Sequence, residues 1–363
     1  MPNNAASAPC HAEYRWPAEW EPHDATWVAW PHNRATWPGR FAHIPDAFAT
    51  LVLTLAEFEI VNVLAEAGAV ARPAERLVGH HARVILHDIA TNDAWIRDFG
   101  PMFLVGLGQD SELPTYVCVD WRFNAWGGKY SPWDRDDAAT RRICEALEVP
   151  RFAQSFVLEG GSVDTDGRGT ILTTESCLLD PRRNGAVDRE AVARVLIEVA
   201  RARHVIWLPG DPLAGDDTDG HVDQVARFVG PRHVVAAIER DTRDVNYVPL
   251  QQNLKHLRAY RDARGKSLQI TTLPLPRPIT FDGRRVPASY CNFYIANGCV
   301  VVPQFEDAAD EVARATLEPI FPDRQVIGLP ARDIIWGLGA FHCLTQQQPR
   351  PGTGSAESCA PPG

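Results

Sequence analysis

The sequence predicts an α/β protein in which similar sub-units follow one another in a closed, radial arrangement. One order of patterns recurs about five times: a β-rich stretch, a turn with Gly or Asp, a second β-rich stretch and a helical segment with polar and apolar positions. Repetition of one supersecondary unit is typical of closed, radially repeated folds. A single doubly wound sheet is the alternative that the same patterns allow.

The elements can be placed along the chain in order. The β-rich stretches are TWVAWP; RVILHDI, WIRDFGPMFLV and TYVCVDW; SFVLEGGSVDTDGRGTILTTESCLL; HVIWLPG and HVDQVARFVGPRHVVAAI; SYCNFYIANGCVVVPQF; and QVIGLPA with AFHCLTQQQ. Helices are predicted near residues 45–57, 136–147, 188–201, 250–263 and 307–320. Asp166 with Gly167, and Asn297 with Gly298, predict hairpin turns because each pair lies between two β-rich stretches.

The composition is that of an ordinary globular protein. Of 363 residues, 45% are hydrophobic and 23% are charged, which excludes a disordered chain, a collagen-like fibre and a coiled coil. The net charge is −10, from 36 basic and 46 acidic residues, and no block of Lys or Arg stands out. This balance argues against nucleic acid or an anionic membrane as partner and suits a small cationic substrate, although a negative surface also keeps proteins soluble.

We expect one folded domain over residues 13–349, with flexible tails at 1–12 and 350–363 that are rich in small residues, Pro and Gly. The N-terminus lacks the pattern of a secretory signal, and no apolar stretch is long enough to cross a membrane, so the predicted location is the cytoplasm. The sequence is also compatible with a homo-oligomer. The eight cysteines form no C-x-x-C pair and are predicted to be reduced thiols: Cys10, Cys118, Cys144, Cys177, Cys291, Cys299, Cys343 and Cys359.

Four short segments place acids, a histidine and a cysteine beside small residues at the ends of β-rich stretches. They are DAWIRD from Asp93 to Asp98, LEGG from Leu158 to Gly161, DGHVD from Asp219 to Asp223 and GAFHC from Gly339 to Cys343. Strand ends of a closed repeat converge near its axis, and small residues let a ligand approach the backbone. Each segment alone also has a structural explanation, such as an ion pair of Arg97 with Asp98 or a buried apolar cysteine.

Taken together, the segments describe nucleophilic chemistry on a cation. His221 and Asp223 are two residues apart, so in a strand both would point to one face. A thiol with a histidine from elsewhere in the chain is an arrangement for nucleophilic catalysis. Nearby acids are a poor environment for a thiolate unless the substrate is positive, and a guanidinium offers the planar fork of donors that carboxylates hold.

Other classes of protein fit parts of the same pattern. A metallohydrolase could use the acids and the histidine between Asp217 and Asp223, but no H-E-x-x-H is present and the first acid of a calcium loop is missing. A dinucleotide site at Gly337 lacks its third glycine. A binding protein without catalysis could use the eleven tryptophans as its contact surface. Those near the N-terminus are better explained as core packing of the first sub-unit.

Seven motifs, in this order, carry a resemblance to a known family: WPAEWEPHDATWVAWP, NDAWIRDFGP, DWRFNAWGGKY, LEGGSVDTDGRGTILTTESCLL, DDTDGHVD, NFYIANGCVVVPQF and HCLTQQQP. The chain resembles the agmatine deiminase family, also called the Porphyromonas-type peptidylarginine deiminase family, of the guanidine-modifying pentein superfamily. The resemblance covers residues 16–349. It implies a five-bladed ββαβ propeller, the pentein fold, with pseudo-fivefold symmetry and an active site on the axis.

The resemblance also implies residue roles. Cys343 would be the nucleophile and His221 the general acid and base, while the carboxylates of Asp98, Glu159 and Asp223 would hold the guanidinium. Trp95 and Asp93 would line the substrate pocket. The implied reaction is hydrolysis of agmatine to N-carbamoylputrescine and ammonia, a step of polyamine metabolism, without a metal or other cofactor; a deiminase for another guanidine or arginine derivative, peptidylarginine included, is the alternative.

The sequence departs from the family pattern at three places. Ala340 replaces an amide three residues before Cys343, the segment after Gly128 looks short, and Ala35 with Thr36 replaces an acid–amide pair. These departures concern recognition of the substrate tail rather than the catalytic groups.

Overall fold

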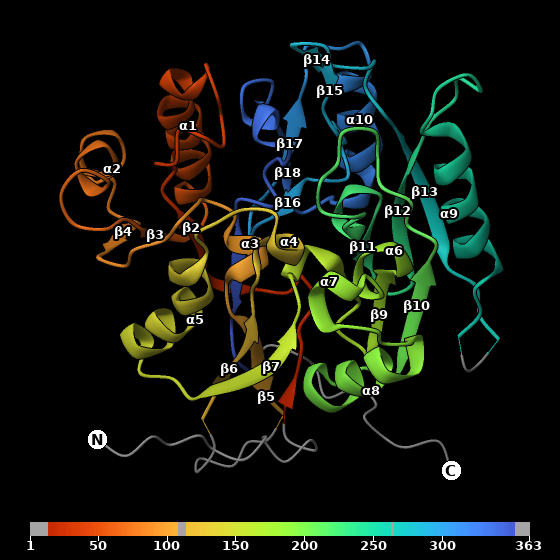
Figure 1. Cartoon of the computed structure of the whole chain (residues 1–363), viewed down its shortest axis with the longest axis horizontal. Coiled ribbons are helices and arrows are strands. Elements are labelled where there is room, and N and C mark those ends of the chain that lie inside the picture. Colours follow the sequence, from red (N-terminus) through yellow and green to blue (C-terminus); the bar gives the residue numbers. More distant parts are fainter. Residues whose placement is uncertain (1–13, 108–113, 263–264, 353–363) are drawn as a thin grey trace.

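The computed structural model describes residues 14–107, 114–262 and 265–352 of the chain. Within these residues five larger sheets occur, and a small hairpin is formed by β14 (Thr280–Phe281) and β15 (Arg284–Arg285). In Figure 1 the successive modules follow one another around the middle of the view, from red at upper left through yellow and green below to blue at the top. The alternative of a single doubly wound sheet is therefore wrong, because the strands are divided among separate small sheets.

Four of the sheets repeat one order of strand, strand, helix, strand. The first two strands of each are antiparallel, and the third is parallel to the second across the helix. The modules are β5 (Met102–Gly106), β6 (Tyr116–Arg122), α5 (Asp134–Leu147), β7 (Arg151–Val157); β8 (Val163–Thr165), β9 (Thr170–Thr174), α8 (Arg189–Ala200), β10 (His204–Leu208); β11 (Ala226–Gly230), β12 (His233–Ile238), α9 (Tyr247–Ala259), β13 (Gln269–Pro274); and β16 (Tyr294–Ile295), β17 (Cys299–Gln304), α10 (Ala309–Leu317), β18 (Gln325–Pro330).

The fifth sheet joins the two ends of the described chain. Its elements are β2 (His23–Ala29), α1 (Ile44–Ala56), β3 (Ile60–Leu64), α2 (Ala71–Leu77) and β4 (Val84–His87), and the antiparallel partner of β2 is the last strand, β19 (Gln346–Pro349). The short β1 (Tyr14–Arg15) pairs with β5. Gln346, which follows the predicted nucleophile by three residues, lies opposite Trp27. This pairing places the segment that contains Cys343 beside the first module.

All five predicted helices are observed, and local chemistry explains their ends. Asp188 accepts a hydrogen bond from the backbone N–H of Ala191 at 2.8 Å and so caps the start of α8. Three aspartates in the first turn of α5 favour that helix start through the helix dipole. Helix α9 ends at Ala259, earlier than predicted, because Tyr260 is extended; residue 263 lies outside the described residues. Both predicted hairpins are present, β8 to β9 and β16 to β17.

The core confirms the structural interpretation of the N-terminal tryptophans. Trp27, Trp30 and Trp37 are among the largest fully buried side chains. Trp30 packs edge-on against Phe48 of α1 with ring centroids 5.4 Å apart. The six described cysteines are free and buried, whereas Cys10 and Cys359 lie outside the described residues. None of the helices in the described residues is long and apolar enough to cross a membrane.

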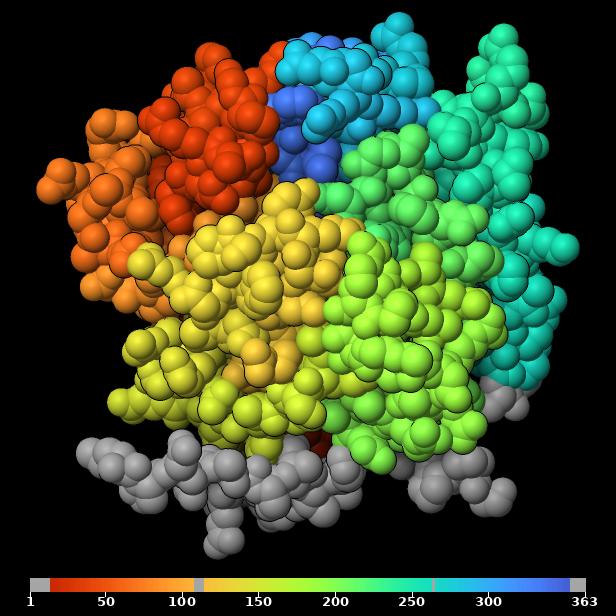
Figure 2. All heavy atoms as spheres, in the orientation of Figure 1, coloured from red at the N-terminus to blue at the C-terminus, as the bar shows by residue number. Residues whose placement is uncertain are grey.

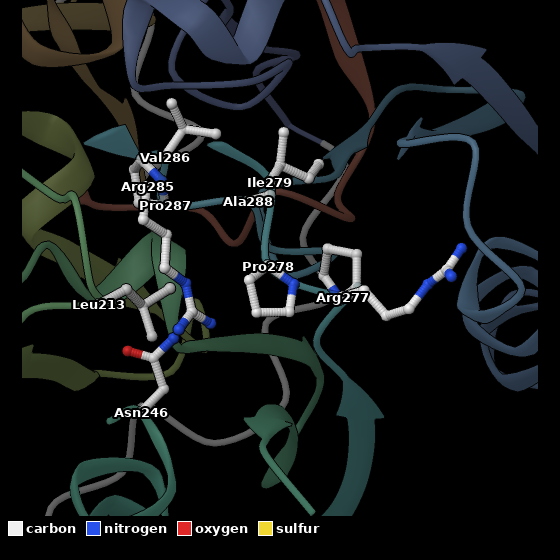
Figure 3. A pocket seen from close by; sticks show the side chains of 10 residues that line it. Leu213, Asn246, Arg277, Pro278, Ile279, Arg285, Val286, Pro287 and Ala288 are labelled. Atoms are coloured by element: carbon white, nitrogen blue, oxygen red, sulfur yellow. The ribbon is translucent and has the colours of Figure 1, made fainter. Parts of the chain in front are cut away.

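Two hollows lie away from the predicted site. The first, seen from close by in Figure 3, is lined by Leu213, Asn246 and the segments around Pro278 and Val286, and its volume of about 10 Å³ has room for one water at most. The second measures about 350 Å³ and lies between Pro38, Phe281 and Trp336. Neither is lined by a residue that the sequence predicted to be catalytic.

Candidate active site

Three side chains from distant parts of the sequence surround Gly161, which lies in the short turn η2 (Gly160–Ser162) after β7. A Cβ atom at Gly161 would lie 2.7 Å from His221 Nδ1, 2.8 Å from Asp98 Oδ1 and 3.0 Å from Asp223 Oδ2. These separations are too short for non-bonded atoms, so only glycine fits there. The predicted acids and histidine therefore face one point. Asp98 belongs to α3 (Ile96–Phe99), which lies near the middle of Figure 1.

Cys343 completes this cluster. Its Sγ lies 3.5 Å from Asp223 Oδ2 and accepts a hydrogen bond from Asn292 Nδ2 at 3.1 Å. Burial, together with the negative charges of Asp223 and Asp98, raises the pKa of the Cys343 thiol well above its ordinary value. The thiol is therefore protonated when the pocket holds no cation.

Asn292 is a functional candidate that the sequence reasoning missed. Besides its contact with the thiol, its Oδ1 accepts hydrogen bonds from the backbone N–H groups of Ala340 at 3.0 Å and Cys343 at 3.3 Å. Its own carbonyl accepts from the N–H of His342 at 3.1 Å. One side chain thus fixes the loop around the nucleophile. The only sequence signal was its place at the start of the NFYIANG motif.

His221 and Asp223 do not lie in a strand, so this part of the prediction is wrong. Residues Val222–Gln224 form a 3-10 turn, η3, and the preceding Asp219 and Gly220 have positive φ angles of 66° and 91°. Asp216 accepts hydrogen bonds from two N–H groups of this loop, those of Thr218 and Gly220. Internal capping of this kind favours a tight loop over a strand. The two side chains still face the same point, but through the turn.

The charge state of His221 follows from its neighbours. Its Nδ1 lies 3.6 Å from Asp98 Oδ1, and its side chain is fully buried. Burial opposes the charged imidazolium, but the carboxylates of Asp98 and Glu159 outweigh it and raise the pKa of His221 well above its ordinary value. His221 is thus favoured in its protonated form and has a proton to give.

Asp98 accepts two hydrogen bonds, but the negative charges of neighbouring acids still act on its carboxylate. Its Oδ1 accepts from the backbone N–H of Gly161 at 3.0 Å, and its Oδ2 accepts from Trp126 Nε1 at 2.9 Å. Burial, partly offset by His221, raises the pKa of Asp98 to about 6. A cation that enters the pocket would lower the pKa of Asp98 and favour its ionised form.

Glu159 differs from the other two predicted carboxylates because a cation already holds it. Arg183 Nε lies 2.9 Å from each oxygen of Glu159, and both side chains are fully buried. Arg183 also donates to Asp219 Oδ2 at 3.0 Å and to the carbonyl of Thr218 at 2.8 Å. The sequence reasoning missed Arg183, which lies in the short helix α7 (Pro181–Asn184) and ties Glu159 to the loop that carries His221.

Of the two predicted pocket residues, Trp95 lies beside the cluster, whereas the contacts of Asp93 are with the segment around Thr36. A Cβ atom at Gly339 would lie 2.7 Å from the ring of Trp95 and 3.2 Å from Cys343 Sγ, so that ring and the thiol flank the same glycine. Asp93 accepts from Asn33 Nδ2 at 3.3 Å and from the hydroxyl of Thr36. Burial raises the pKa of Asp93 to about 6 despite these donors.

A strained segment covers one side of the cluster. In α4 (Ala125–Gly128) four successive residues have positive φ angles, including 52° at Ala125 and 56° at Trp126. Such angles are unfavourable for residues with a Cβ and persist where surrounding contacts hold them. Here Trp126 is held by Asp98, and Tyr130 donates its hydroxyl proton to Asp217. In Figure 2 the yellow and green parts of the surface, which include α4 and α7, meet over the middle of the molecule.

The acids of this loop do not form a cation site of their own. Lys129, Arg182 and Arg183 all pair with Asp219, at 2.8 to 3.0 Å. Among the described residues, one group of three side chains could offer ligand atoms to a metal ion. The ligand atoms of Glu159, Cys177 and His221 lie within 4.8 Å of one another. Because Arg183 occupies both oxygens of Glu159, this group does not fit a metal ion either.

The five predicted catalytic side chains are closed off from solvent. None of Asp98, Glu159, His221, Asp223 and Cys343 is more than 4% exposed. Burial of this extent strengthens every electrostatic interaction in the pocket. Asp223 Oδ1 is the notable atom, since it is buried and has no hydrogen-bond partner among the described residues.

Comparison with known proteins decides the family. The family model for the Porphyromonas-type peptidyl-arginine deiminases matches residues 15–349. The chain belongs to this family. It is 39% identical to an agmatine deiminase of Pseudomonas aeruginosa strain LESB58 over 96% of its own length and 99% of the relative.

Solved structures of this peptidyl-arginine deiminase family give the same picture. An agmatine deiminase of Enterococcus faecalis superposes with a TM-score of 0.88 at 32% identity, over 96% of this chain and 100% of that one. A cysteine-to-serine variant of the C. jejuni agmatine deiminase with substrate bound superposes with a TM-score of 0.85 at 29% identity, over 93% and 97% of the two chains. The predicted resemblance is thereby confirmed.

Proposed function

We propose that this chain hydrolyses agmatine to N-carbamoylputrescine and ammonia through a covalent intermediate on Cys343. The observation that carries this proposal is the buried Asp223 Oδ1, which has no hydrogen-bond partner within the described part of the chain, beside a thiol and a protonated imidazole. A planar cation with several N–H donors supplies what this pocket lacks. The names of the relatives, agmatine deiminases of similar length, support the choice of substrate.

Substrate charge and nucleophile activation are linked in this proposal. In the empty pocket, burial and the charges of Asp223 and Asp98 keep the thiol of Cys343 protonated. A guanidinium held by Asp98 and Asp223 places a positive charge beside the sulfur and favours the thiolate. The nucleophile is then formed only when a suitable cation is bound.

The chemistry proceeds in two displacements. The Cys343 thiolate forms a bond to the central guanidinium carbon, and the electron pair of one C–N double bond moves to nitrogen. Protonated His221 gives its proton to the leaving nitrogen, the C–N bond breaks, and ammonia departs, which leaves a thiouronium intermediate. Neutral His221 then takes a proton from water as the water oxygen attacks the same carbon. The C–S bond breaks while the hydroxyl proton of the tetrahedral intermediate passes to the sulfur, which releases the ureido product and the thiol of Cys343.

Glu159 has a supporting part in this scheme. Its pairing with Arg183 leaves it in place beside His221, whose pKa its charge helps to raise. Asp98 and Asp223 are the two carboxylates free to hold the guanidinium along its edges, while Glu159 keeps His221 protonated for the first step.

Two further acids are suited to the other end of agmatine. Tyr130 donates to Asp217, and the carboxylates of Asp217 and Asp93 both raise the pKa of Tyr130, so the three groups are neighbours. An aliphatic ammonium would be attracted by Asp93 and Asp217. The cations nearby, Lys129 and Arg183, are already paired with Asp219, which leaves them poorly placed to bind the carboxylate of free arginine.

We also infer that the five sheets close into a five-bladed propeller with this site on its axis. The repeated strand–strand–helix–strand order and the pairing of β19 with β2, which joins the chain ends, support this arrangement. A ring of modules explains why segments from three different modules meet at Gly161.

The experiment that tests the function is an ammonia-release assay on the full chain with a panel of guanidines. Agmatine is expected to give the highest kcat/KM, and free arginine to be a weak substrate. Faster turnover of arginine or of a peptidylarginine would overturn the agmatine assignment and keep a guanidine deiminase. Absence of ammonia from every guanidine, with binding intact, would instead indicate a catalytically silent binding protein.

A further inference from the structure

A fully buried ionic cluster lies directly beneath the candidate active site, and its centre is Glu19. The carboxylate of Glu19 has four partners: it accepts hydrogen bonds from the backbone N–H of Ile295 at 2.9 Å and from Arg97 Nη2 at 3.2 Å, His342 Nε2 lies 2.9 Å away, and Arg227 Nη2 forms an ion pair at 2.8 Å. These groups outweigh burial and hold the pKa of Glu19 well below its ordinary value. The cluster therefore favours Glu19 as an anion.

His342, the residue before the nucleophile, connects this cluster to the pocket. Its Nε2 lies 2.9 Å from Glu19 Oε2, and its Nδ1 lies 2.7 Å from Asp223 Oδ2. An ionised carboxylate is an acceptor only, so each ring nitrogen needs a proton to make its contact. A neutral imidazole has one such proton, and only the imidazolium satisfies both contacts.

The charged groups around His342 come from several elements. They are the carboxylates of Glu19, Asp164 and Asp223, the guanidinium groups of Arg97 and Arg227, and the thiol of Cys343, and His221 adds a further cation beside Asp223. Buried charges without a close counter-ion are strongly unfavourable, so the contact of each ring nitrogen of His342 with a carboxylate favours a proton on both nitrogens.

We propose that His342 is a positioning residue whose ring bridges Glu19 and Asp223 with a proton on each nitrogen, which neutralises Asp223 on the side of Cys343 and leaves Asp223 Oδ1 directed to the substrate cation. Asp223 Oδ2 is shared between His342 at 2.7 Å and the thiol at 3.5 Å, whereas Oδ1 has no partner among the described residues. The imidazolium therefore lowers the barrier to ionising Cys343 without entering the pocket. This inference rests on the proposed role of Cys343 as the nucleophile.

The charge of His342 can be measured directly in the full, unmodified chain. In ¹⁵N-histidine-labelled protein at neutral pH, both ring nitrogens of His342 are expected to give imidazolium signals, with assignment by loss of the signal in His342→Gln. A neutral imidazole signal for His342 would overturn the proposal. This readout does not depend on activity, so it separates the charge of His342 from the function proposed for the site.

The effect on the nucleophile is read from the pH dependence of alkylation of Cys343 by iodoacetamide, a neutral reagent. His342→Gln is expected to shift this profile upward by about one pH unit, which is about a tenfold slower reaction at a fixed pH. His23→Gln is the matched control, because His23 is equally buried and contacts the carbonyl of Glu19 and the carboxylate of Glu59, away from the thiol. It is expected to lower stability and leave the profile unchanged.

Glu19→Gln provides a second variant should His342→Gln fail to fold. Glu19→Gln removes one of the two carboxylates that the ring of His342 bridges, so alkylation of Cys343 and kcat/KM are expected to fall by about tenfold below the wild type at a fixed pH. Glu59→Gln, which removes another buried carboxylate with several donors, is expected to retain the wild-type profile. Equal profiles for Glu19→Gln and Glu59→Gln would show that the cluster is only structural.

Discussion

The candidate active site and the ionic cluster beneath it contain the same kinds of residue in opposite electrostatic states. In the pocket, burial raises the pKa of Asp98 to about 6, and burial with nearby acids raises the pKa of the Cys343 thiol. In the cluster, Arg227, His342 and Arg97 overcome burial and lower the pKa of Glu19. Both carboxylates are fully buried, so the number of cationic donors, and not burial, makes the difference.

The acids of the pocket therefore lack cationic partners that a ligand can supply, whereas Glu19 in the ionic cluster already has its partners. An acid with too few donors favours the arrival of a cation, and the protein is less stable for holding it. Glu19 has four partners within the protein, so it contributes rigidity and its carboxylate oxygens are not available to bind a ligand. Asp223 lies at the boundary, with Oδ2 bound to the cluster and Oδ1 free.

The largest expected effect comes from removing the nucleophile. Cys343→Ser is expected to lower kcat by about four orders of magnitude or more with an unchanged unfolding midpoint, because a serine hydroxyl does not ionise under these conditions. Ammonia release and thermal unfolding measure the two quantities. A cationic haloacetamidine should also label Cys343 faster than Cys299, whose buried thiol has a pKa raised to about 12. Equal labelling of the two thiols would contradict the assignment.

A substitution in the ionic cluster around Glu19 should lower the stability of the fold. Arg227→Met leaves Glu19 and Asp164 without their shared cation, and the free energy of unfolding is expected to fall by about 3–5 kcal/mol. Chemical denaturation measures the change. Arg194→Met, at an exposed pair with Glu190, is the control and should stay within about 0.5 kcal/mol of the wild type. A small loss at Arg227 would mean that the cluster does not stabilise the fold.

Removal of a charged group from the pocket should lower catalysis rather than stability. Asp98→Asn is expected to lower kcat/KM by about 1.5–3 kcal/mol, roughly 10- to 150-fold, through loss of a charged hydrogen bond to the cation. The free energy of unfolding should stay level or rise. Asp120→Asn offers the control, since Asp120 is a buried acid that pairs with Arg151 outside the site. Normal turnover of Asp98→Asn would place this carboxylate outside the reaction.

The raised pKa of Asp98 predicts opposite responses of activity and stability to acid. As pH falls through about 6, Asp98 gains a proton and its charge for the substrate is lost, so kcat/KM is expected to fall about tenfold per unit below that value. The folded state binds this proton more tightly than the unfolded state, so Asp98 opposes folding less as pH falls from about 6 to about 4. The stability difference between wild type and Asp98→Asn should shrink over this window; a constant difference would show that Asp98 titrates elsewhere.

The smallest effect is expected at Asn292. Asn292→Ala removes the donor to Cys343 Sγ, and kcat/KM should fall by about 0.5–1.5 kcal/mol, roughly two- to twelvefold. The alkylation profile of Cys343 should move to higher pH. Asn253→Ala, which removes a buried amide that accepts from the N–H of Gly210, should lower stability only. Identical thiol profiles in the two variants would leave Asn292 as a structural residue.

The sequence predicted that Cys343, His221 and Asp98 lie together, because each lies beside small residues at the end of a β-rich stretch, and the structure brings the three side chains together. Their catalytic roles stay predictions. The repeated strand and turn patterns likewise predicted the five helices and both hairpins.

Partners that complete the site could not be predicted, because their roles depend on contacts across the fold. Glu19 reaches His342 across 323 positions of sequence, and Asn292 reaches Cys343 across 51. Arg183 looks in the sequence like any surface arginine, yet it is buried against Glu159. The strand predicted through His221 failed for a local reason, since Asp216 caps the loop before it.

Gly161 sets a limit for anyone who wishes to re-engineer this pocket for another guanidine. Because every side chain at that position would collide with the acids and the imidazole around it, saturation libraries that include residue 161 spend their variants on inactive proteins. Diversity is better placed at Trp95, Trp126 and Tyr130, whose rings border the pocket without supplying its reactive atoms. The catalytic centre would then stay constant while the space for the substrate tail changes.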